Sequence, residues 1–481
     1  MNYSYIIRSV GRIMCILAVF MLPAMLISLY HNEMRSVLAF LTAVLMLLAI
    51  GLPSALIKLR RKQFYWREGF VTVAAAWIVV SLFGAIPYYA SGAIDSAVNC
   101  IFESVSGFTT TGASIVTDVE ALPLGILYWR SFTLWLGGMG VLLFVLALGP
   151  SDMGAGNSFY LFRAESPGPS VRKLVPKLKD SAKILYAIYV IITITQILLL
   201  VIGRVPLFDA VNIAFSTAGT GGFAVRNDSI MSYSEYAQNV TAVFMVICGI
   251  NFTLFYFIIS REFLNVFKDE ELRVYFIIIL VSIVLVTGNI HPMYDTLWQA
   301  LQHAAFQVTS VISSSGISTA DYTQWPGFSH ILFLVLMVIG SSAGSTGCGI
   351  KISRLIIMAK SMRASVRNAI SPASVNLIYL NGELVDEDTQ INVSSFMLIY
   401  VAAVAVSSLV ISLNGFDLET TVSSVLATIN NTGIGLGEVG PASNYLRFSD
   451  LSKLTFCMNM LLGRLEFYPM LVLFSPSTWR K

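Results

Sequence analysis

Residues 97–114 read AVNCIFESVSGFTTTGAS, and this stretch decides the fold. Its apolar part, Ala97 to Phe108, is too short to cross a bilayer, because a transmembrane helix needs about 20 residues. It runs directly into a cluster of threonine and glycine, which are poor helix formers. A short apolar helix followed by such a loop predicts a segment that enters a membrane and turns back.

The same pattern occurs three more times, roughly 100 residues apart, as expected for a repeated supersecondary unit. The further copies are Phe208 to Ala218 followed by AGTGGF, Leu297 to Ser310 followed by SSSGIS, and Thr421 to Asn430 followed by NNTGIGLG. The glycines that mark the four copies are Gly112, Gly222, Gly316 and Gly435. We therefore predict four tandem units of membrane helix, short pore helix, loop and membrane helix.

The composition agrees with a membrane protein. Of the 481 residues, 56% are hydrophobic and 12% are charged, and the mean hydropathy is +0.75. Soluble domains carry about 25% charged residues. A disordered chain, a secreted disulfide scaffold and a nucleic-acid-binding protein are therefore excluded, and a net charge of +3 is too small to imply an acidic partner.

The reactive residue types form no catalytic pattern. The five cysteines are scattered without CxxC spacing, and the four histidines include no HExxH motif. No nucleophile elbow or phosphate-binding loop is present either. We predict a protein that is not an enzyme and has no covalent cofactor. The rival from another class is an intramembrane hydrolase that pairs a serine with His303.

Ten full crossings are predicted, and an even number places both termini on one side of the membrane. The first apolar stretch follows Arg8 and Arg12 but lacks a small-residue cleavage site, so we expect a retained helix. The crossings are expected at about residues 10–30, 36–57, 70–90, 127–148, 184–203, 238–260, 274–290, 328–358, 391–413 and 453–476.

Lysine and arginine gather in the loops on the side of the termini. Cytoplasmic loops are the cation-rich ones, so both termini are predicted to be cytoplasmic. The basic stretch Val171 to Lys183 lies along an anionic leaflet or forms a solvated loop. The cation-rich segments are 58–67, 172–183, 261–273 and 360–367.

The predicted fold is an all-α polytopic membrane protein with four repeats in a pseudo-fourfold arrangement. Two transmembrane helices precede the repeats. The expected domains are 1–66 for the two N-terminal helices and 67–160, 161–270, 271–375 and 376–481 for pore repeats 1 to 4.

Four such loops indicate an ion pathway. Non-helical backbone at membrane depth is costly unless it lies within protein or lines a wet cavity. A ring of backbone carbonyl oxygens replaces the hydration shell of a cation without adding a full negative charge. The alternative, that the small residues only form tight turns or helix packing contacts, explains one such loop more easily than four.

Two further features lie in apolar crossings. Residues 340–349 read GSSAGSTGCG, where four glycines disfavour a continuous helix, so we predict an unwound segment that gates the pathway. The alternative is a small-residue packing surface. Arg464 lies deep in MLLGRLEFYPMLVLF, and a buried guanidinium there would oppose cations. Its alternative role is an ion pair with another helix, and Glu466 is not on the same helical face.

With these motifs in place, the chain resembles the bacterial TrkH/TrkG potassium uptake proteins of the Trk/Ktr/HKT superfamily nearly from end to end. The two additional N-terminal crossings are typical of that branch. The motifs that carry the resemblance are FESVSGFTTTGAS (102–114), LWLGGMG (134–140), YLFRAESPGP (160–169), FSTAGTGGF (215–223), AGSTGCGIKISR (343–354), ATINNTGIGLGEV (427–439) and MLLGRLEFYPMLVLF (460–474).

The resemblance implies a selectivity filter for K⁺ and a gate beneath it. A glycine in the first loop is the family's pattern for potassium over sodium. The implied filter residues are Thr110, Thr111, Gly112, Thr220, Gly221, Gly222, Ser314, Ser315, Gly316, Gly433, Ile434 and Gly435. The implied gate residues are Gly344, Ser345, Thr346, Gly347, Cys348, Gly349 and the pore arginine Arg464.

The resemblance also implies partners. It predicts a homodimer in the bacterial inner membrane, each subunit with its own pore, and a cytoplasmic TrkA-like ring that binds the regulatory nucleotide in place of this chain. Two departures bear on the function: SSSGIST replaces the family's TTAGFTT pattern in the third loop, and Cys348 stands where a glycine is usual. The expected function is K⁺ uptake, with a proton- or sodium-coupled symporter as the alternative.

Overall fold

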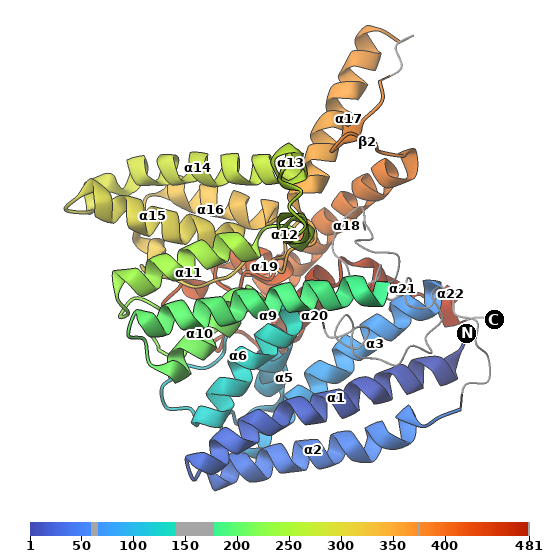
Figure 1. Ribbon diagram of the computed structural model, residues 1–481, viewed down its shortest axis with the longest axis vertical. Coiled ribbons are helices and arrows are strands. Elements are labelled where there is room, and N and C mark those ends of the chain that lie inside the picture. Colours follow the sequence, from blue (N-terminus) through green and yellow to red (C-terminus); the bar gives the residue numbers. More distant parts are fainter. Residues whose placement is uncertain (59–65, 141–177, 373–375, 480–481) are drawn as a thin grey trace.

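A computed structural model describes residues 1–58, 66–140, 178–372 and 376–479 (Figure 1). Within these ranges nearly all regular structure is helical, which confirms the predicted fold class. The one sheet among the described residues is a hairpin in which β1 (Tyr379–Leu380) pairs antiparallel with β2 (Glu383–Leu384). The predicted boundary at 160/161, the 160–169 motif and most of the basic stretch from Val171 lie outside the described residues, and the boundary at 375/376 borders a gap.

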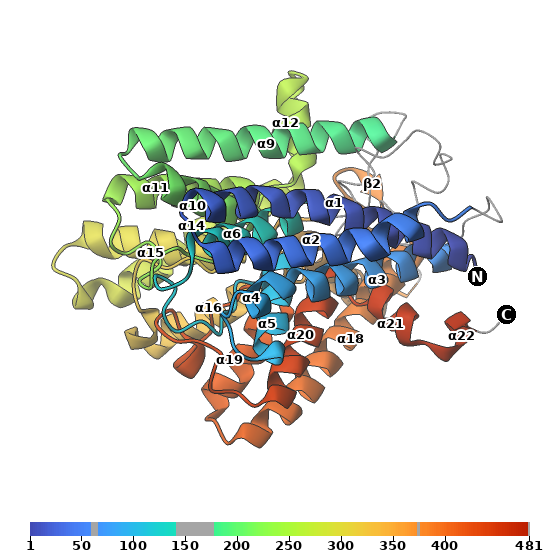
Figure 2. The ribbon, with the colours of Figure 1, turned by 90° about the horizontal axis from the view of Figure 1, so that it is seen from below.

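The N-terminal pair consists of α1 (Tyr3–Tyr30) and α2 (Met34–Ala55), which lie side by side on one face of the molecule (Figure 2). They approach closely at two glycines. A Cβ added to Gly11 would lie 2.6 Å from the Cβ of Ser54, and one added to Gly51 would lie 3.0 Å from that of Met14. Small residues allow this approach where lipid removes the hydrophobic driving force for helix association.

The remaining elements follow the predicted repeat order. The first repeat contains α3 (Trp66–Gly84), α4 (Ile86–Ala90), α5 (Ala97–Phe108) and α6 (Leu124–Gly138). The second contains α9 (Leu178–Ile202), α10 (Leu207–Gly219), α11 (Glu235–Cys248), α12 (Phe252–Ile259) and α13 (Phe263–Lys268). The third contains α14 (Glu270–Ile290), η1 (His291–Met293), α15 (Leu297–Ile312), η2 (Tyr322–Gln324), α16 (Gly327–Ile339) and α17 (Ile352–Ile370). The fourth contains α18 (Glu387–Ile411), η3 (Ser412–Asn414), α19 (Leu418–Ile429), η4 (Gly437–Val439), α20 (Asp450–Arg464), α21 (Tyr468–Phe474) and α22 (Pro476–Trp479).

Six of the ten predicted crossings are long, apolar helical spans in the described residues. Of the other four, three are interrupted and one runs into residues that are not described. The stretch 238–260 bends by 93° between α11 and α12, and 328–358 is interrupted between α16 and α17. The stretch 453–476 breaks between α20 and α21, and 127–148 continues past α6 into residues that are not described. Glycines in the breaks after α11 and α16 cost helix stability, and hydropathy alone does not register them.

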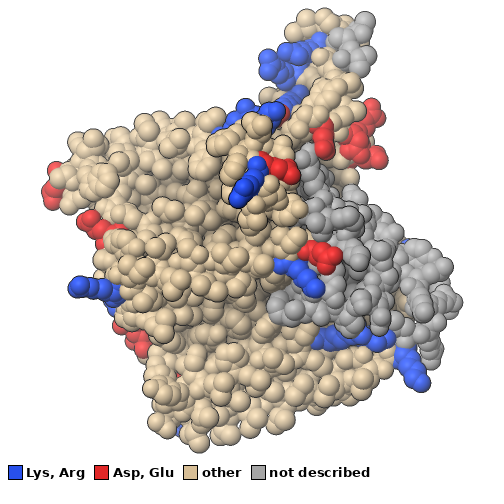
Figure 3. Space-filling model, viewed as in Figure 1, with Lys and Arg blue, Asp and Glu red and all other residues tan. Residues whose placement is uncertain are grey.

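Charge is distributed as expected for a membrane protein. On the face shown in Figure 3, charged side chains gather at two opposite ends, and a broad band without charge lies between them. The start of α1 and the end of α22 meet at one of these ends, where the rings of Tyr3 and Trp479 stack with centroids 6.3 Å apart. The two ends of the described chain therefore lie on the same side.

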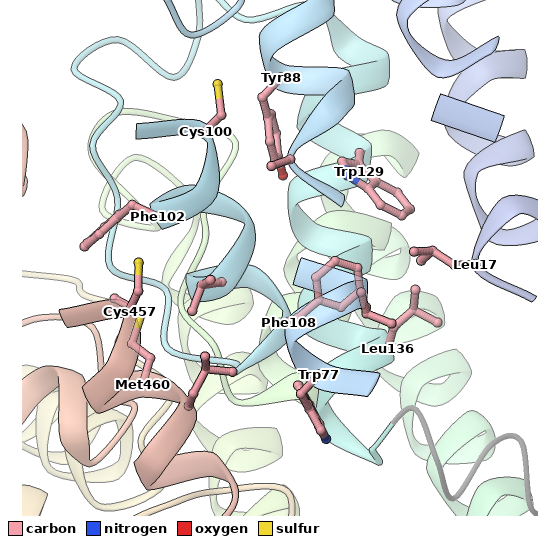
Figure 4. Packing of buried hydrophobic residues seen from close by; sticks show 14 of the residues in the cluster. Leu17, Trp77, Tyr88, Cys100, Phe102, Phe108, Trp129, Leu136, Cys457 and Met460 are labelled. Atoms are coloured by element: carbon pink, nitrogen blue, oxygen red, sulfur yellow. The ribbon is translucent and has the colours of Figure 1, made fainter. Parts of the chain in front are cut away.

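The pore helix α5 is held by a core of large side chains (Figure 4). The rings of Phe108 in α5 and Trp129 in α6 lie with centroids 6.0 Å apart, and the indole of Trp129 donates to the carbonyl of Gly84 at 3.1 Å. In the middle of α5, Phe102 packs against Phe456 of α20. The short helix is thus held by neighbours at its middle and at its C-terminal end, which it needs because a helix of this length is marginal alone.

Candidate functional site

Each pore helix ends in the same hydrogen-bonded turn. In the first copy, the amide of Thr110 donates to the carbonyl of Gly107 at 3.0 Å, and the amide of Thr111 donates to that of Ser106 at 2.9 Å. This pair of bonds is a Schellman motif, which places one residue in the left-handed conformation. That residue is Thr110, with φ +57°. The equivalent residues are Thr220, Ser314 and Asn431, whose φ values are +53°, +55° and +51°.

Two residues later, each loop has a glycine that lies against the next loop. A Cβ added to Gly112 would be 1.6 Å from the carbonyl oxygen of Gly221, a contact that only glycine allows. The corresponding distances are 2.5 Å from Gly222 to the Ser315 oxygen, 2.3 Å from Gly316 to the Thr432 oxygen and 2.1 Å from Gly433 to the Thr111 oxygen. These contacts run from the first loop to the second, third, fourth and back to the first. The four loops therefore close a ring.

The register of the fourth loop differs from the predicted one. The ring position is occupied by Gly433, with φ +79°, and not by Gly435. The amide of Gly435 donates to the carbonyl of Val439 at 2.8 Å, and its carbonyl accepts from the hydroxyl of Tyr322 at 2.9 Å. Gly435 thus belongs to the turn after the ring. Three glycines in NNTGIGLG left several registers open, and only the backbone conformation distinguishes them.

A cavity of about 130 Å³ lies beside the ring, on the side to which the loops continue. Its lining includes the four ring glycines together with Ser114, Ile434 and Arg130. The pore helices enter from the end of the molecule opposite the described termini, because α3 begins at the terminal end and α5 follows its far end (Figure 1). The cavity is therefore a mouth at the end opposite the termini.

The predicted unwound segment is present between α16 and α17, and it lies directly against the third loop. The amide of Cys348 donates to the hydroxyl of Ser314 at 2.7 Å. A Cβ added to Gly347 would lie 2.6 Å from the carbonyl oxygen of Ser313. The segment thus contacts the ring from the side opposite the mouth.

Buried polar groups hold this segment in place. One carboxylate oxygen of Glu271, a residue that is 5% exposed, accepts from the amides of Ala343 at 2.7 Å and Ser353 at 3.0 Å. The hydroxyl of Thr346 donates to the carbonyl of Cys248 at 3.1 Å, and the buried ammonium of Lys351 donates to the carbonyl of Gly347. These bonds satisfy backbone groups that the interrupted helix leaves unpaired.

Arg464, at the end of α20, joins the unwound segment to the first repeat. Its guanidinium donates to the carbonyl of Thr346 at 3.0 Å and contacts the sulfur of Cys348 at 3.3 Å. It also donates to the hydroxyl of Thr110 at 3.3 Å and to the carbonyl of Gly138 at 2.7 Å, at the C-terminus of α6. A cation suits a helix C-terminus, where carbonyl groups lack partners.

Glu466 does not serve as a partner for Arg464. Its carboxylate pairs with Arg354 of α17, whose guanidinium lies 4.0 Å from the centre of the Phe396 ring. Among the described residues, the polar contacts of Arg464 are to hydroxyl, thiol and carbonyl groups. Its positive charge is thus solvated by neutral dipoles, which leaves the charge uncompensated for an approaching cation.

The structure brings most predicted residues together at the ring and below it. Gly344 to Gly349 and Arg464 meet beneath the ring, Ile434 lines the mouth, and Gly435 lies outside the ring. The predicted residues in the ring or in the turns that lead into it are Thr110, Thr111, Gly112, Thr220, Gly221, Gly222, Ser314, Ser315, Gly316 and Gly433.

Sequence reasoning missed four positions that the structure places at the site. Asn431 and Thr432 occupy the fourth copy of the turn, and the side-chain amide of Asn431 donates through Nδ2 to the hydroxyl of Thr111 at 2.8 Å. Glu103 and Arg130 lie behind the first loop as a buried ion pair. The signal for Arg130 was available, because it is an arginine inside an apolar crossing, as Arg464 is.

Comparison with known proteins agrees with this architecture. Residues 37–481 match the family model TrkH, described as cation transport protein. The chain is 34% identical to the potassium uptake protein TrkH of Halomonas elongata, with all of both chains covered, and 32% identical to TrkG of Escherichia coli K12, with 98% of this chain and 97% of the relative covered.

The solved structures include a similar protein. The crystal structure of the potassium transporter TrkH from Vibrio parahaemolyticus superimposes with a TM-score of 0.89 at 29% identity, with both chains fully covered. The molecule is accordingly a multi-pass helical membrane protein and a transporter rather than an enzyme. From the family match, the full-length relatives and the shared fold, the chain belongs to the TrkH family of cation transport proteins.

Proposed function

We propose that this protein takes up K⁺ across the bacterial cytoplasmic membrane through the ring of four loops. The observation that carries the proposal is the closure of the ring, in which each glycine lies against a backbone carbonyl of the next loop. The names of the relatives, which are potassium uptake and potassium transport proteins, support K⁺ as the ion. The mouth then faces outward and both termini face the cytoplasm.

The proposed filter works through main-chain oxygen atoms. Carbonyl groups of the turns at Thr110, Thr220, Ser314 and Asn431, and of the residues that follow them, face the axis and replace water around a dehydrated ion. The pore helices end at these turns, so the negative ends of their dipoles point toward the ion. No full charge is needed at the axis, which keeps binding weak enough for release.

The proposed gate consists of the unwound segment and Arg464. The segment contacts the ring through Cys348, and Arg464 bonds both to this segment and to the first loop. A change in the position of the segment therefore also changes the position of a fixed positive charge. A cytoplasmic TrkA-like ring that binds a nucleotide, acting on a homodimer, is the proposed source of that change. The names of the relatives support a system with more than one component, because they describe these proteins as belonging to a Trk system.

Two buried carboxylates bear on the alternative of a coupled symporter. Glu103 is ion-paired with Arg130, and Glu271 accepts two backbone amides. Both are committed to internal partners, so neither is placed to carry a proton along the pathway. This favours passive, gated flux over coupled transport.

Ion flux in proteoliposomes tests the function. We expect K⁺ uptake down its own gradient that exceeds Na⁺ uptake and persists when the proton gradient is collapsed by an ionophore. Uptake that stops with the proton gradient would support the symporter. Absence of any K⁺ flux from purified, monodisperse protein, with and without its cytoplasmic partner, would contradict the proposal.

The register of the fourth loop gives a matched pair of variants. Gly433→Ala should reduce K⁺ uptake by about tenfold or more, because a Cβ there would lie 2.1 Å from a backbone oxygen at φ +79°. Gly435→Ala should reduce it by less than about threefold, since its closest contact is the movable side chain of Val439 at 2.8 Å. Initial rates of ⁸⁶Rb⁺ uptake measure both, and a larger loss at position 435 would refute the register.

A further inference from the structure

A fully buried ion pair lies beside the ring, between Glu103 of α5 and Arg130 of α6. Arg130 Nε lies 2.8 Å from a carboxylate oxygen of Glu103, and the two side chains are 0% and 2% exposed. A buried pair of this kind is weak evidence for stability, because desolvation offsets most of its attraction. Its presence beside the mouth therefore calls for another explanation.

The carboxylate of Glu103 holds the outgoing limb of the first loop. It accepts from the amide of Ile115 at 3.0 Å and from the hydroxyl of Ser114 at 3.0 Å. These residues are the second and third after the ring glycine Gly112. The pore helix thus fixes the loop on both sides of the ring, through its own C-terminal turn below and through Glu103 above.

Arg130 extends the same network to the second loop. Its guanidinium donates to the carbonyl of Ala224 at 3.3 Å and lies 4.1 Å from the centre of the Phe223 ring. It also donates to the hydroxyl of Ser114 at 3.1 Å. One planar group with several donors therefore links the outgoing limbs of two neighbouring loops, a geometry that a lysine ammonium cannot reproduce.

The other repeats brace their loops differently. In the third repeat, Gln307 takes the place of Glu103, nine residues before the ring glycine. In the orientation of its side-chain amide that satisfies both its oxygen and its nitrogen, the oxygen accepts from the backbone amide of Thr319 at 2.9 Å. In the fourth, the hydroxyl of Ser423 accepts from the amide of Leu436 at 3.0 Å. In the second repeat the position of Glu103 is the apolar Ile213. Next to its ring glycine, the second loop is instead held by Arg130 of the first repeat, which bonds the carbonyl of Ala224. Farther along the same loop, Arg226 pairs with Asp209 of α10.

The pair also controls charge at the mouth. Arg130 lines the cavity beside the ring, where an uncompensated guanidinium would repel an entering cation. Glu103 neutralises that charge at 2.8 Å. Position and charge are thus set by the same two side chains.

We propose that Glu103 and Arg130 are positioning residues for ion selection, which fix the spacing between the first and second loops and keep the mouth neutral. The inference rests on the proposed function, because it assumes that the ring is the filter. It makes the outgoing limb of the second loop depend on Arg130 of the first repeat, whereas the equivalent limbs of the third and fourth loops are held by Gln307 and Ser423 of their own pore helices. Loss of the pair should therefore relax the preference for K⁺ over Na⁺ before it prevents flux.

The test uses the full-length protein in proteoliposomes and compares ⁸⁶Rb⁺ uptake with ²²Na⁺ uptake. Arg130→Lys keeps a positive charge beside Glu103 but cannot bridge Ser114 and Ala224 together. Glu103→Gln copies the side chain that the third repeat uses, retains an acceptor for Ile115 and removes the neutralising charge. Both variants should lower the Rb⁺/Na⁺ uptake ratio by at least about tenfold, which corresponds to about 1.4 kcal/mol.

Arg447→Gln is the matched control, because it breaks an ion pair with Glu438 whose side chains are 72% and 46% exposed. Its uptake ratio should equal that of the wild type. The uptake of each variant is divided by the amount of its protein that elutes as a monodisperse peak. A folding defect then lowers the protein yield and leaves the Rb⁺/Na⁺ uptake ratio unchanged. Should either variant fail to accumulate, Ser114→Ala removes the hydroxyl that both side chains share and should lower the ratio in the same direction.

Three results have distinct meanings. A lowered ratio in the pair variants with an unchanged Arg447→Gln control supports the inference. If the wild type prefers Rb⁺ over Na⁺ and the pair variants, or Ser114→Ala in their place, keep the same uptake ratio, the inference is overturned and the proposed function stands. A wild type that takes up Rb⁺ and Na⁺ equally overturns the proposed function and the inference with it.

Discussion

A Gly112→Ser variant is expected to lose its preference for K⁺ over Na⁺ by about tenfold or more. The first loop has its ring glycine at φ +77°, a conformation that costs an L-residue about 1–2 kcal/mol. The added Cβ would also lie 1.6 Å from the carbonyl oxygen of Gly221. Because no side chain atom fits there, the second loop must move away and the ring must widen.

A wider ring fails to replace the hydration of K⁺ evenly, and it admits ions that keep part of their water. The measurement is the ratio of ⁸⁶Rb⁺ to ²²Na⁺ uptake into proteoliposomes of known protein content. We expect the ratio to fall through a loss of Rb⁺ uptake as well as a relative gain of Na⁺ uptake. The effect should exceed that of any single substitution outside the ring.

Gly288→Ala provides the control for this variant. Gly288 lies in α14, and a Cβ added to it would have no heavy atom within 4 Å. Alanine favours a helix over glycine by about 1 kcal/mol, so this variant should fold and transport like the wild type. An unchanged uptake ratio in Gly112→Ser at normal protein yield would show that the first loop does not line the ion pathway.

The pore helices could be predicted from sequence because length and periodicity suffice for them. The expected stretch Ala97 to Phe108 coincides with α5, and Leu297 to Ser310 falls within α15. Residues that favour turns or have low helix propensity flank both helices, so the ends of the helices can be predicted from the local sequence. The meeting of the four loops at one axis could likewise be predicted, because non-helical backbone at membrane depth must lie within protein or line a wet cavity.

The features that escaped prediction depend on contacts between distant segments. Whether Gly433 or Gly435 occupies the ring is decided by the approach of Thr111, more than 300 residues away. The break between α11 and α12 is stabilised by the unwound segment, since the amide of Phe252 donates to the carbonyl of Gly344 at 3.0 Å. The apolar run through 238–260 gives no sign of that partner, so hydropathy predicted one continuous crossing there.

An Arg464→Ala variant is expected to raise cation flux in the absence of any activating partner by about tenfold or more. At 4 Å and an effective dielectric constant of about 20, two unit charges interact by about 4 kcal/mol. Arg464 reaches the hydroxyl of Thr110 in the first loop, so an ion leaving the ring passes close to this guanidinium. Its removal therefore lowers a barrier on the pathway.

The same change also releases the unwound segment, because the bonds of Arg464 to Thr346 and Gly138 are lost. Arg464→Lys separates the two effects: it keeps the positive charge but cannot hold both carbonyl groups in one fixed geometry. If charge dominates, the lysine variant should remain near the wild-type flux, and if the link to the segment dominates, it should leak like the alanine variant. Basal ⁸⁶Rb⁺ uptake distinguishes these cases, and an alanine variant with normal yield and wild-type flux would mean that Arg464 does not restrict the pathway.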